Sequence, residues 1–236
     1  MRKIDKTCAL STAYLKWQAN LGKTAPYPKY NSSNNEYYLD IVTQLLYCQR
    51  GLCAYTEQFL AEKEVYNPSH WAKGRYQSPK PEFEGQLEHF DESKKAKKAD
   101  KHGIADWEWD NFFLVADVIN TKVKGTKAVD NILKPDAVNY DPLTKLAYNP
   151  ATHRYSPHTD LSPQDHQRVK FMIKTLGLNF GPVIRKRREI LKYALKKNQD
   201  LTSSEILYEG QFPTAYSMTI IAQQAGQDDS ILSDFL

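Results

Sequence analysis

The chain has 236 residues and a formal net charge of +4, a length that suffices for one large domain or for a small catalytic unit with helical extensions. No stretch approaches the 18 to 20 or so continuous apolar residues of a membrane span, and the charged start at Met1–Asp5 lacks the apolar core of a signal peptide. The three cysteines cannot build a disulfide framework, so we expect a cytoplasmic protein with no membrane partner.

Two helices are predicted in an N-terminal helical segment, residues 1–51. The first spans about Ser11 to Leu21. The second begins after a cap at Ser33 or Asn34 and is stopped by Gly51. Further on, residues 62–85 are rich in Tyr, Pro, Lys and Glu without a steady period, which predicts an irregular connection.

The middle of the chain carries the residues with the clearest chemistry. Leu87–Phe90 ends one predicted strand, Phe112–Val115 supplies a second, and a polar helix containing Asn120 follows. This strand, strand, helix order can place Glu88, His89 and Asn120 around one point. A carboxylate and an amide oxygen suit a hard divalent cation, Mg²⁺ first and Mn²⁺ as the alternative, while a neighbouring imidazole can deprotonate a water.

These pieces resemble the HNH, or ββα-metal, nuclease motif, in which the final histidine is often replaced by asparagine. The resemblance implies that His89 is the general base and that Glu88 and Asn120 are the metal ligands. It also implies that Asn111 braces the loop of the catalytic site. Taken singly, His89 is better read as an ordinary strand-end histidine and Asn120 as a helix-surface amide. Together and in this order, the residues favour the motif.

Lysines lie on both sides of this motif. Lys94 and Lys95 begin a cluster between the two predicted strands, while Lys122, Lys124 and Lys127 belong to the predicted helix or follow it. Basic groups around a metal attract a phosphate backbone and make binding dependent on salt. We therefore expect these lysines to bind nucleic acid, with a solvated loop as the alternative for the first cluster.

A second resemblance begins at Cys53–Glu57. It is to the HNH endonucleases of retron and Septu antiphage systems, known as PtuB, which carry four zinc cysteines. Of these only Cys53 stands here, with Thr56 and Asp117 among the replacements. A lone cysteine cannot hold a tetrahedral structural zinc, so we expect none, and we expect Cys53 to be a small buried hydrophobe. Packing must then join the two segments, with these candidates: Leu52, Tyr55, Phe59, Phe113, Val115, Val118 and Ile119.

The same resemblance extends over about Gln49 to Leu195. The family's GTK and DP segments match Gly125–Lys127 and Asp141–Pro142, and its LGLN and RR segments match Leu176–Asn179 and the RKRREIL string that follows. The resemblance implies a PtuA-like ABC-type ATPase as partner and, in retrons, a reverse transcriptase with its msDNA.

The C-terminal third reads as a hairpin followed by helices. Asn149-Pro150 favours a turn between two short strands, and His153 and His158 beside it are expected at the surface. A helix capped by Ser162 and a second from Pro182 follow. On the second helix Arg185, Lys186, Arg187, Arg188 and Lys192 are expected mostly outward. A further short helix is predicted in the tail, whose apolar end is expected to dock: Ile231, Leu232, Phe235 and Leu236.

We therefore expect a mainly helical α+β protein with an HNH ββα-metal core at residues 52–135 and a C-terminal helical region at residues 136–236. The expected function is that of a metal-dependent endonuclease effector in antiviral defence, cutting phosphodiester bonds in DNA or in an RNA such as tRNA. The alternative is a non-catalytic, HNH-like binding or scaffold subunit of a defence complex. Cleavage that depends on a divalent metal separates the two.

Overall fold

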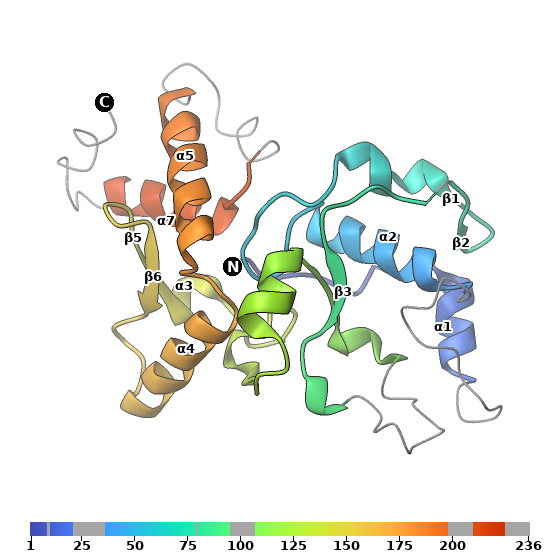
Figure 1. Ribbon diagram of the computed structural model, residues 1–236, viewed down its shortest axis with the longest axis horizontal. Helices are drawn as coiled ribbons and strands as arrows, with labels where there is room; N and C mark the ends of the chain where they lie inside the picture. The colour runs from blue at the N-terminus through green and yellow to red at the C-terminus, as the bar shows by residue number, and fades with distance from the viewer. Residues whose placement is uncertain (9, 21–35, 79, 95–106, 198–209, 225–236) are drawn as a thin grey trace. The chain divides into compact units, whose positions relative to one another are not determined.

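The computed structural model describes residues 1–8, 10–20, 36–78, 80–94, 107–197 and 210–224 (Figure 1). Backbone contacts divide the chain into two compact units. The motif unit comprises residues 4–54 and 59–129, and the C-terminal unit comprises residues 1–3, 55–58 and 130–236. Residues 4–51 therefore pack with the predicted nuclease core, and residues 130–135 belong to the other unit.

The motif unit combines short helices with two strand pairs, which gives the mixed α+β character predicted from the sequence. Its elements are α1 (Thr12–Gln18), α2 (Tyr38–Gln49), η1 (Lys63–Tyr66), η2 (Pro68–His70), β1 (Trp71–Ala72), β2 (Arg75–Tyr76), β3 (Gln86–His89), η3 (Glu92–Lys94), η5 (Trp109–Asn111), β4 (Phe112–Val115) and the π-helix η6 (Ile119–Lys124).

The two predicted N-terminal helices are present. Ser11 caps α1, because its hydroxyl accepts a hydrogen bond from the backbone N–H of Tyr14 at 3.1 Å. The second helix starts at Tyr38, later than predicted, and its N-cap Tyr37 makes no side-chain capping bond. The predicted caps Ser33 and Asn34 lie outside the described residues.

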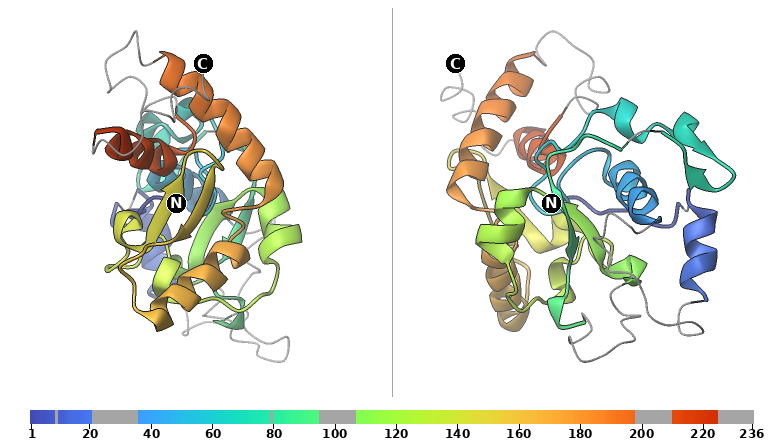
Figure 2. Two further views of the ribbon diagram at one scale, coloured as in Figure 1. Left: turned by 90° about the vertical axis from the view of Figure 1, so that its left-hand side faces the viewer. Right: turned by 45° about the vertical axis from the view of Figure 1, so that its right-hand side comes forward.

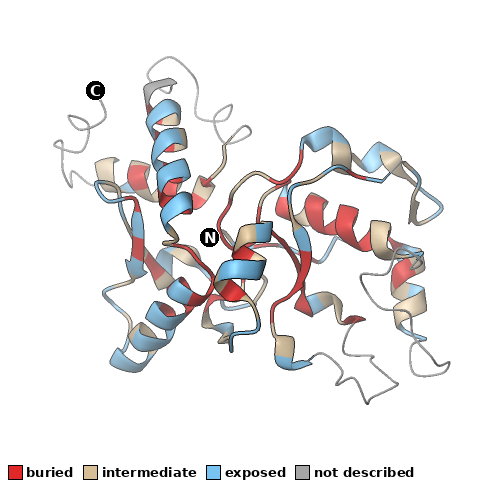
Figure 3. Ribbon diagram, in the orientation of Figure 1, coloured by how far each residue is buried: buried red, intermediate tan, exposed pale blue. Residues whose placement is uncertain are grey.

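Helix α2 is buried along most of its length and lies beside the β3–β4 pair (Figures 1 and 3). It ends at Arg50 in the left-handed conformation, with Gly51 at φ 68°. This end places the chain so that Gly51 accepts hydrogen bonds from the backbone N–H groups of Leu60 and Ala61, at 2.7 and 3.1 Å. The next segment therefore folds back along the end of α2.

The stretch predicted to be irregular contains a short hairpin. Strands β1 and β2 pair antiparallel, with Trp71 opposite Tyr76. The turn residues Lys73 and Gly74 both have positive φ, at 51° and 73°, which is the requirement of the tight turns that suit twisted strands. The prediction of an irregular connection was wrong here because strands of two residues carry no readable period.

The C-terminal unit packs helices on a second hairpin, and α4 and α7 contact β6 and β5, respectively (Figure 2). Among the described residues, no helix is both long enough and apolar enough to cross a bilayer. The elements are η7 (Asn131–Leu133), α3 (Pro142–Lys145), β5 (Leu146–Asn149), β6 (Arg154–Pro157), α4 (Pro163–Thr175), α5 (Gly181–Lys197) and α7 (Pro213–Gln224).

The hairpin around Asn149-Pro150 and the cap at Ser162 are confirmed. Strands β5 and β6 pair antiparallel, and the Ser162 hydroxyl accepts from the Asp165 backbone N–H at 3.2 Å. The predicted apolar stripe of α4 is buried: Val169, Met172, Ile173 and Leu176. The predicted tail helix is α7, while the apolar end from Ile231 to Leu236 lies outside the described residues.

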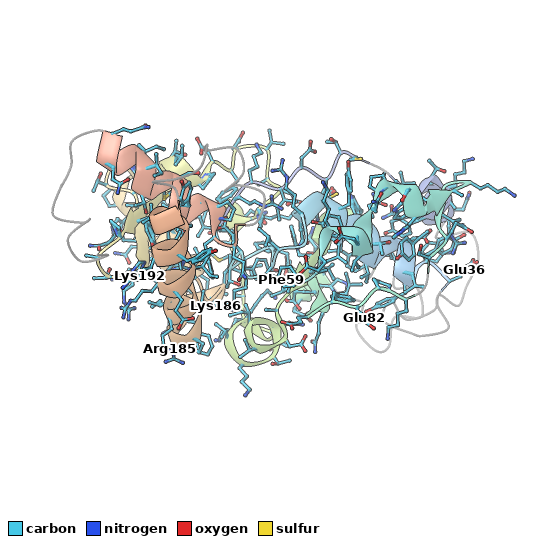
Figure 4. All side chains as sticks on the ribbon, turned by 90° about the horizontal axis from the view of Figure 1, so that it is seen from above. Glu36, Phe59, Glu82, Arg185, Lys186 and Lys192 are labelled. Carbon is cyan, nitrogen blue, oxygen red and sulfur yellow. The ribbon has the colours of Figure 1, made fainter. Side chains whose placement is uncertain are left out.

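Two polar residues predicted at the surface lie in the core of this unit. Arg187 is 1% exposed, and its guanidinium donates to the carbonyls of His153 and Leu178, each at 2.7 Å. Its charge also lies over the rings of Tyr155 and Phe212. The other residues of this basic string, such as Arg185, Lys186 and Lys192, remain outside on α5 (Figure 4).

His153 is also buried, at 3% exposed, and its Nδ1 lies 2.8 Å from the hydroxyl of Tyr148. Burial, together with the positive charges of Arg188 and Arg187, lowers the pKa of His153 to about 4. The ring is therefore neutral at physiological pH, so its Nδ1 can accept a hydrogen bond from the Tyr148 hydroxyl.

We expect Arg187→Ala to destabilise the protein by about 2–5 kcal/mol, because two buried carbonyls lose a charged donor and two rings lose their cation. Chemical denaturation measures this change. The matched control is Arg188→Ala on the exposed side of α5, which should cost less than about 0.5 kcal/mol. Equal effects of the two substitutions would contradict the structural role of Arg187.

A second expectation concerns pH. Because the pKa of folded His153 is about 4 and that of an unfolded histidine is about 6.5, the unfolded chain binds the proton first as the pH falls. The contribution of His153 to stability is therefore complete above about pH 6.5 and is lost progressively down to about pH 4. Melting temperatures between pH 7.5 and pH 4.5 should fall less steeply for His153→Gln than for the wild type. His158→Gln should keep the wild-type slope.

Candidate functional site

The site is built on the antiparallel pair of β3 and β4. Glu88 lies opposite Phe113 and His89 opposite Phe112. Side chains opposite one another share a face, and consecutive residues of a strand point to opposite faces. Gln86 and Glu88 therefore lie on one face of β3, while the side chain of His89 lies on the other with Phe112.

Glu88 is a buried carboxylate with a buried cation beside it. It is 3% exposed, and its Oε1 accepts a hydrogen bond from the Nζ of Lys124, which is 0% exposed. The same ammonium donates to the carbonyl of His89 at 3.1 Å and to that of Gly125 at 3.4 Å. A charge can be buried only when it is paired and hydrogen-bonded. Each partner therefore offsets the desolvation cost of burying the other.

Asn120 lies on the same face of β3. Its Nδ2 donates to the Oε1 of Gln86 at 3.1 Å, one helical turn before Lys124 reaches Glu88. Helix η6 thus runs beside β3, with Asn120 next to Gln86 and Lys124 next to Glu88 (Figure 1). The structure brings the two predicted metal ligands to one face, and the cation found at the Glu88 carboxylate is the lysine.

His89 occupies a different position from the one expected. Its ring is 0% exposed and packs against Phe112 at 4.9 Å between centroids, on the face opposite to Glu88. Its backbone carbonyl accepts a hydrogen bond from Lys124. The structure therefore gathers Glu88 and Asn120 on one face and does not bring the His89 imidazole to that face.

Asn111 holds the turn that leaves β3 through its side chain. Its side-chain oxygen accepts from the backbone N–H of Asp91 at 2.8 Å, and its amide donates to the Asp91 carbonyl at 3.1 Å. The Asn111 carbonyl accepts from the N–H of Phe90 at 2.8 Å. These bonds extend the β3–β4 pairing past His89 and fix the first residues of the following loop.

The predicted nucleic-acid-binding lysines fall into three groups. Lys122 and Lys127 are exposed. Lys94 is about half exposed and forms an ion pair with Glu108 at 3.3 Å, while Lys95 lies outside the described residues. Lys124 was predicted to bind nucleic acid, but its burial and its bond to Glu88 keep it from a phosphate backbone in this arrangement.

The segments that zinc cysteines would join are held by hydrogen bonds. The buried side chain of Gln49 accepts from the N–H of Leu114 and donates to its carbonyl, both at 2.9 Å. The Leu114 carbonyl also accepts from the Ala54 N–H at 3.0 Å, and Cys53 Sγ accepts from the Ala116 N–H at 3.4 Å. Cys53 is 2% exposed, as predicted for a small buried residue, whereas Asp117 is exposed.

The N-terminal segment supports the residues that precede β4. The hydroxyl of Tyr14 and the amide of Gln18 both donate to the carbonyl of Trp107, at 2.9 and 2.7 Å. Lys6 donates to the Trp109 carbonyl at 3.0 Å, and its Nζ lies 3.8 Å from the ring centre of Phe113. A second buried cation therefore lies near the cross-strand partner of Glu88.

The structural roles of Lys124 and Gln49 were not predicted from the sequence. Lys124 was assigned to the surface, although its position four residues after Asn120 places it on the same side of a helix. Gln49 was named only as the start of the family resemblance, and its contact with Leu114 spans a separation that no local pattern encodes.

No known family model matches the chain, and no curated protein matches it with significant similarity. Within the described ranges, no cluster of three or more His, Cys, Asp or Glu side chains is arranged to hold a metal.

We expect Gln49→Leu to destabilise the protein by about 2–5 kcal/mol. The substitution leaves the backbone N–H and the carbonyl of Leu114 without their buried amide partner. Chemical denaturation measures this. Gln77→Leu, at an exposed glutamine, is the control and should stay within about 0.5 kcal/mol of the wild type.

The companion measurement is thermal melting with and without a strong chelator. A fold held by Gln49 and apolar packing should melt at nearly the same temperature in both conditions. Stoichiometric zinc bound through Cys53, together with a chelator-dependent loss of stability, would show that thiolate coordination joins these segments.

Proposed function

We propose that the chain is a metal-dependent endonuclease of the HNH type that acts in antiviral defence. The observation that carries the proposal is the placement of Glu88 and the helix bearing Asn120 on one face of a β3–β4 pair. Asn111, at the start of β4, braces the turn after His89. The order of strand, strand and helix and the four residue types are those of the motif, which supports the proposal.

The residues on this face fit a hard divalent cation. A buried carboxylate is paired with a positive charge here, and the amide of Asn120 lies on the same face of β3, bonded to Gln86. Glu88 and Asn120 would hold Mg²⁺, or Mn²⁺, through oxygen donors. When bound, such an ion supplies Lewis-acid stabilisation of the charge that develops on a phosphodiester.

In this proposal His89 is the general base, taking a proton from the attacking water at a ring nitrogen. The Lys124 ammonium on its carbonyl and the Asn111 bonds to the next turn fix the backbone of His89. Because the ring is buried against Phe112, the proposal requires this end of β3 to open when nucleic acid binds.

The substrate proposed is a nucleic-acid phosphodiester, in DNA or in an RNA such as tRNA. The exposed Lys122 and Lys127 follow Asn120 and can neutralise the phosphates next to the scissile one. The PtuA-like ATPase partner, together with the retron reverse transcriptase and its msDNA, belongs to the proposal through the family resemblance alone.

The second candidate is a non-catalytic binding or scaffold subunit with an HNH-like core. The observations that favour it are the pairing of Glu88 with a lysine and the full burial of the His89 ring. In a purely structural core, the permanent pairing of Glu88 with Lys124 would contribute to stability.

We expect His89→Ala to reduce cleavage by about a hundredfold to ten-thousandfold, the usual contribution of a positioned base, while leaving the far-ultraviolet circular dichroism unchanged. The assay is cleavage of labelled DNA and tRNA by the purified protein with its ATPase partner in Mg²⁺. His158→Ala is the matched control and should keep wild-type activity. Wild-type protein without metal-dependent cleavage would favour the scaffold subunit, and an active His89→Ala would remove His89 from catalysis.

A further inference from the structure

The ion pair of Glu88 and Lys124 has a consequence for any metal that binds this face. We propose that Lys124 is a resident counter-cation, which a divalent ion must displace from Glu88 in order to bind. Binding of the metal then releases Lys124, the last residue of η6, from Glu88 in the same step. This inference rests on the proposed function for the identity of the ligands, and its test does not depend on cleavage.

The first argument is the number of bonds that the ammonium makes. Lys124 Nζ contacts the Glu88 carboxylate, the His89 carbonyl and the Gly125 carbonyl, so all three of its protons have an acceptor direction. A side chain held in this way has little freedom. The Lys124 ammonium occupies the position beside Glu88 Oε1, the oxygen that the metal would need.

The second argument is electrostatic. Glu88 and Lys124 together are neutral, and both are almost fully buried. A divalent ion that joined them without displacing the lysine would leave two net positive charges in a buried place, with the ammonium of Lys6 over the neighbouring ring of Phe113. Like charges at short range in a low dielectric repel strongly, so the ion and the ammonium exclude one another.

The third argument is the helix itself. Residues Ile119–Lys124 form a π-helix, and the N–H of Gly125 bonds to the carbonyl of Asn120 at 2.8 Å, five residues back. The π turn is rare and is a frequent feature of functional sites. A change to the α pairing rotates Lys124 about the helix axis relative to Asn120. The segment therefore offers a route by which the ammonium leaves while the strands stay in place.

The fourth argument concerns the path by which the Lys124 side chain can reach solvent. Thr121 and Lys122, on the outer side of the same turn, are exposed, and Gly125 follows at φ 51° and ψ −136°. A Cβ built on Gly125 would meet no atom within 4 Å, so the backbone conformation and not a lack of space is what calls for glycine here. The C-terminal end of η6 thus lies next to solvent, into which Lys124 can move.

The arrangement sets the apparent metal affinity. A metal that must break the internal pair binds more weakly than it would to an uncompensated carboxylate, by the factor that corresponds to the population of the open state. Replacing Lys124 with an uncharged residue removes that competition and should raise the affinity for the ion.

The binding experiment uses Mn²⁺, measured by electron paramagnetic resonance and by calorimetry on the full chain. Lys124→Met should bind Mn²⁺ at least about tenfold more tightly than the wild type, since a tenfold change corresponds to about 1.4 kcal/mol. Lys170→Met, at an exposed lysine of α4, is the control and should bind as the wild type does. Adding Glu88→Gln or Asn120→Ala to Lys124→Met should abolish the gain.

The stability experiment follows the same variants by thermal melting. Lys124→Met should lower the melting temperature by about 6–20 °C without metal, because a buried carboxylate loses its partner, and saturating Mn²⁺ should restore much of the loss. The double variant Lys124→Met with Glu88→Gln should recover stability without metal and should show no response to Mn²⁺. Should Lys124→Met fail to fold, Lys124→Gln keeps a donor to Glu88 without the charge and serves for the same titration.

Unchanged or weaker Mn²⁺ binding in the folded Lys124 variants would overturn the counter-cation role, whatever the nuclease assay gives. Tighter binding that is lost with Glu88→Gln would support it, even if the wild type cleaves no nucleic acid. In that case the displacement mechanism would stand and the proposed endonuclease activity would fall.

Discussion

The buried ion pair between Glu88 and Lys124 is the interaction on which the rest of the motif unit depends. Its cost in desolvation is several kcal/mol for each ion, and only good geometry with further hydrogen bonds offsets that cost. The ammonium obtains those bonds from the carbonyls of His89 and Gly125. One side chain therefore joins the end of β3, with the Glu88 carboxylate and the His89 carbonyl, to the end of η6, two parts that lie far apart in the chain.

The other support of this unit is a set of hydrogen bonds to the backbone of β4 and the residues before it. Gln49 holds both backbone groups of Leu114, and Tyr14 and Gln18 hold the carbonyl of Trp107. The N-terminal helices are thus part of the same cooperative unit as the strand pair. These hydrogen bonds keep β4 in place, with the buried Cys53 contributing one weak acceptor.

Local signals predicted much of the fold. The Ser162 cap and the apolar stripe of α4 could be read from spacing alone, and Asn149-Pro150 marked its hairpin. Arg187, His153 and Lys124 could not be placed in this way, because each is polar and is buried by partners far along the chain. Residue type predicts exposure on average, and the exceptions are residues whose charge or hydrogen-bonding groups find internal partners. Of these three exceptions, Lys124 lies where Glu88, Asn111 and Asn120 were expected to form a site, while Arg187 and His153 lie in the C-terminal unit.

The two candidate functions make different use of the same carboxylate. A scaffold gains from a pair that never opens, whereas a metal-dependent enzyme needs a carboxylate that its internal cation can leave. The π-helical geometry of η6, the glycine after Lys124 and the exposure of the outer side of that turn all favour a lysine that can leave. Lys124 also holds the carbonyl of His89, so its departure frees the strand end that carries the proposed base. The arrangement that withholds the carboxylate from a metal thus also holds His89 in its buried position, and one displacement acts on both.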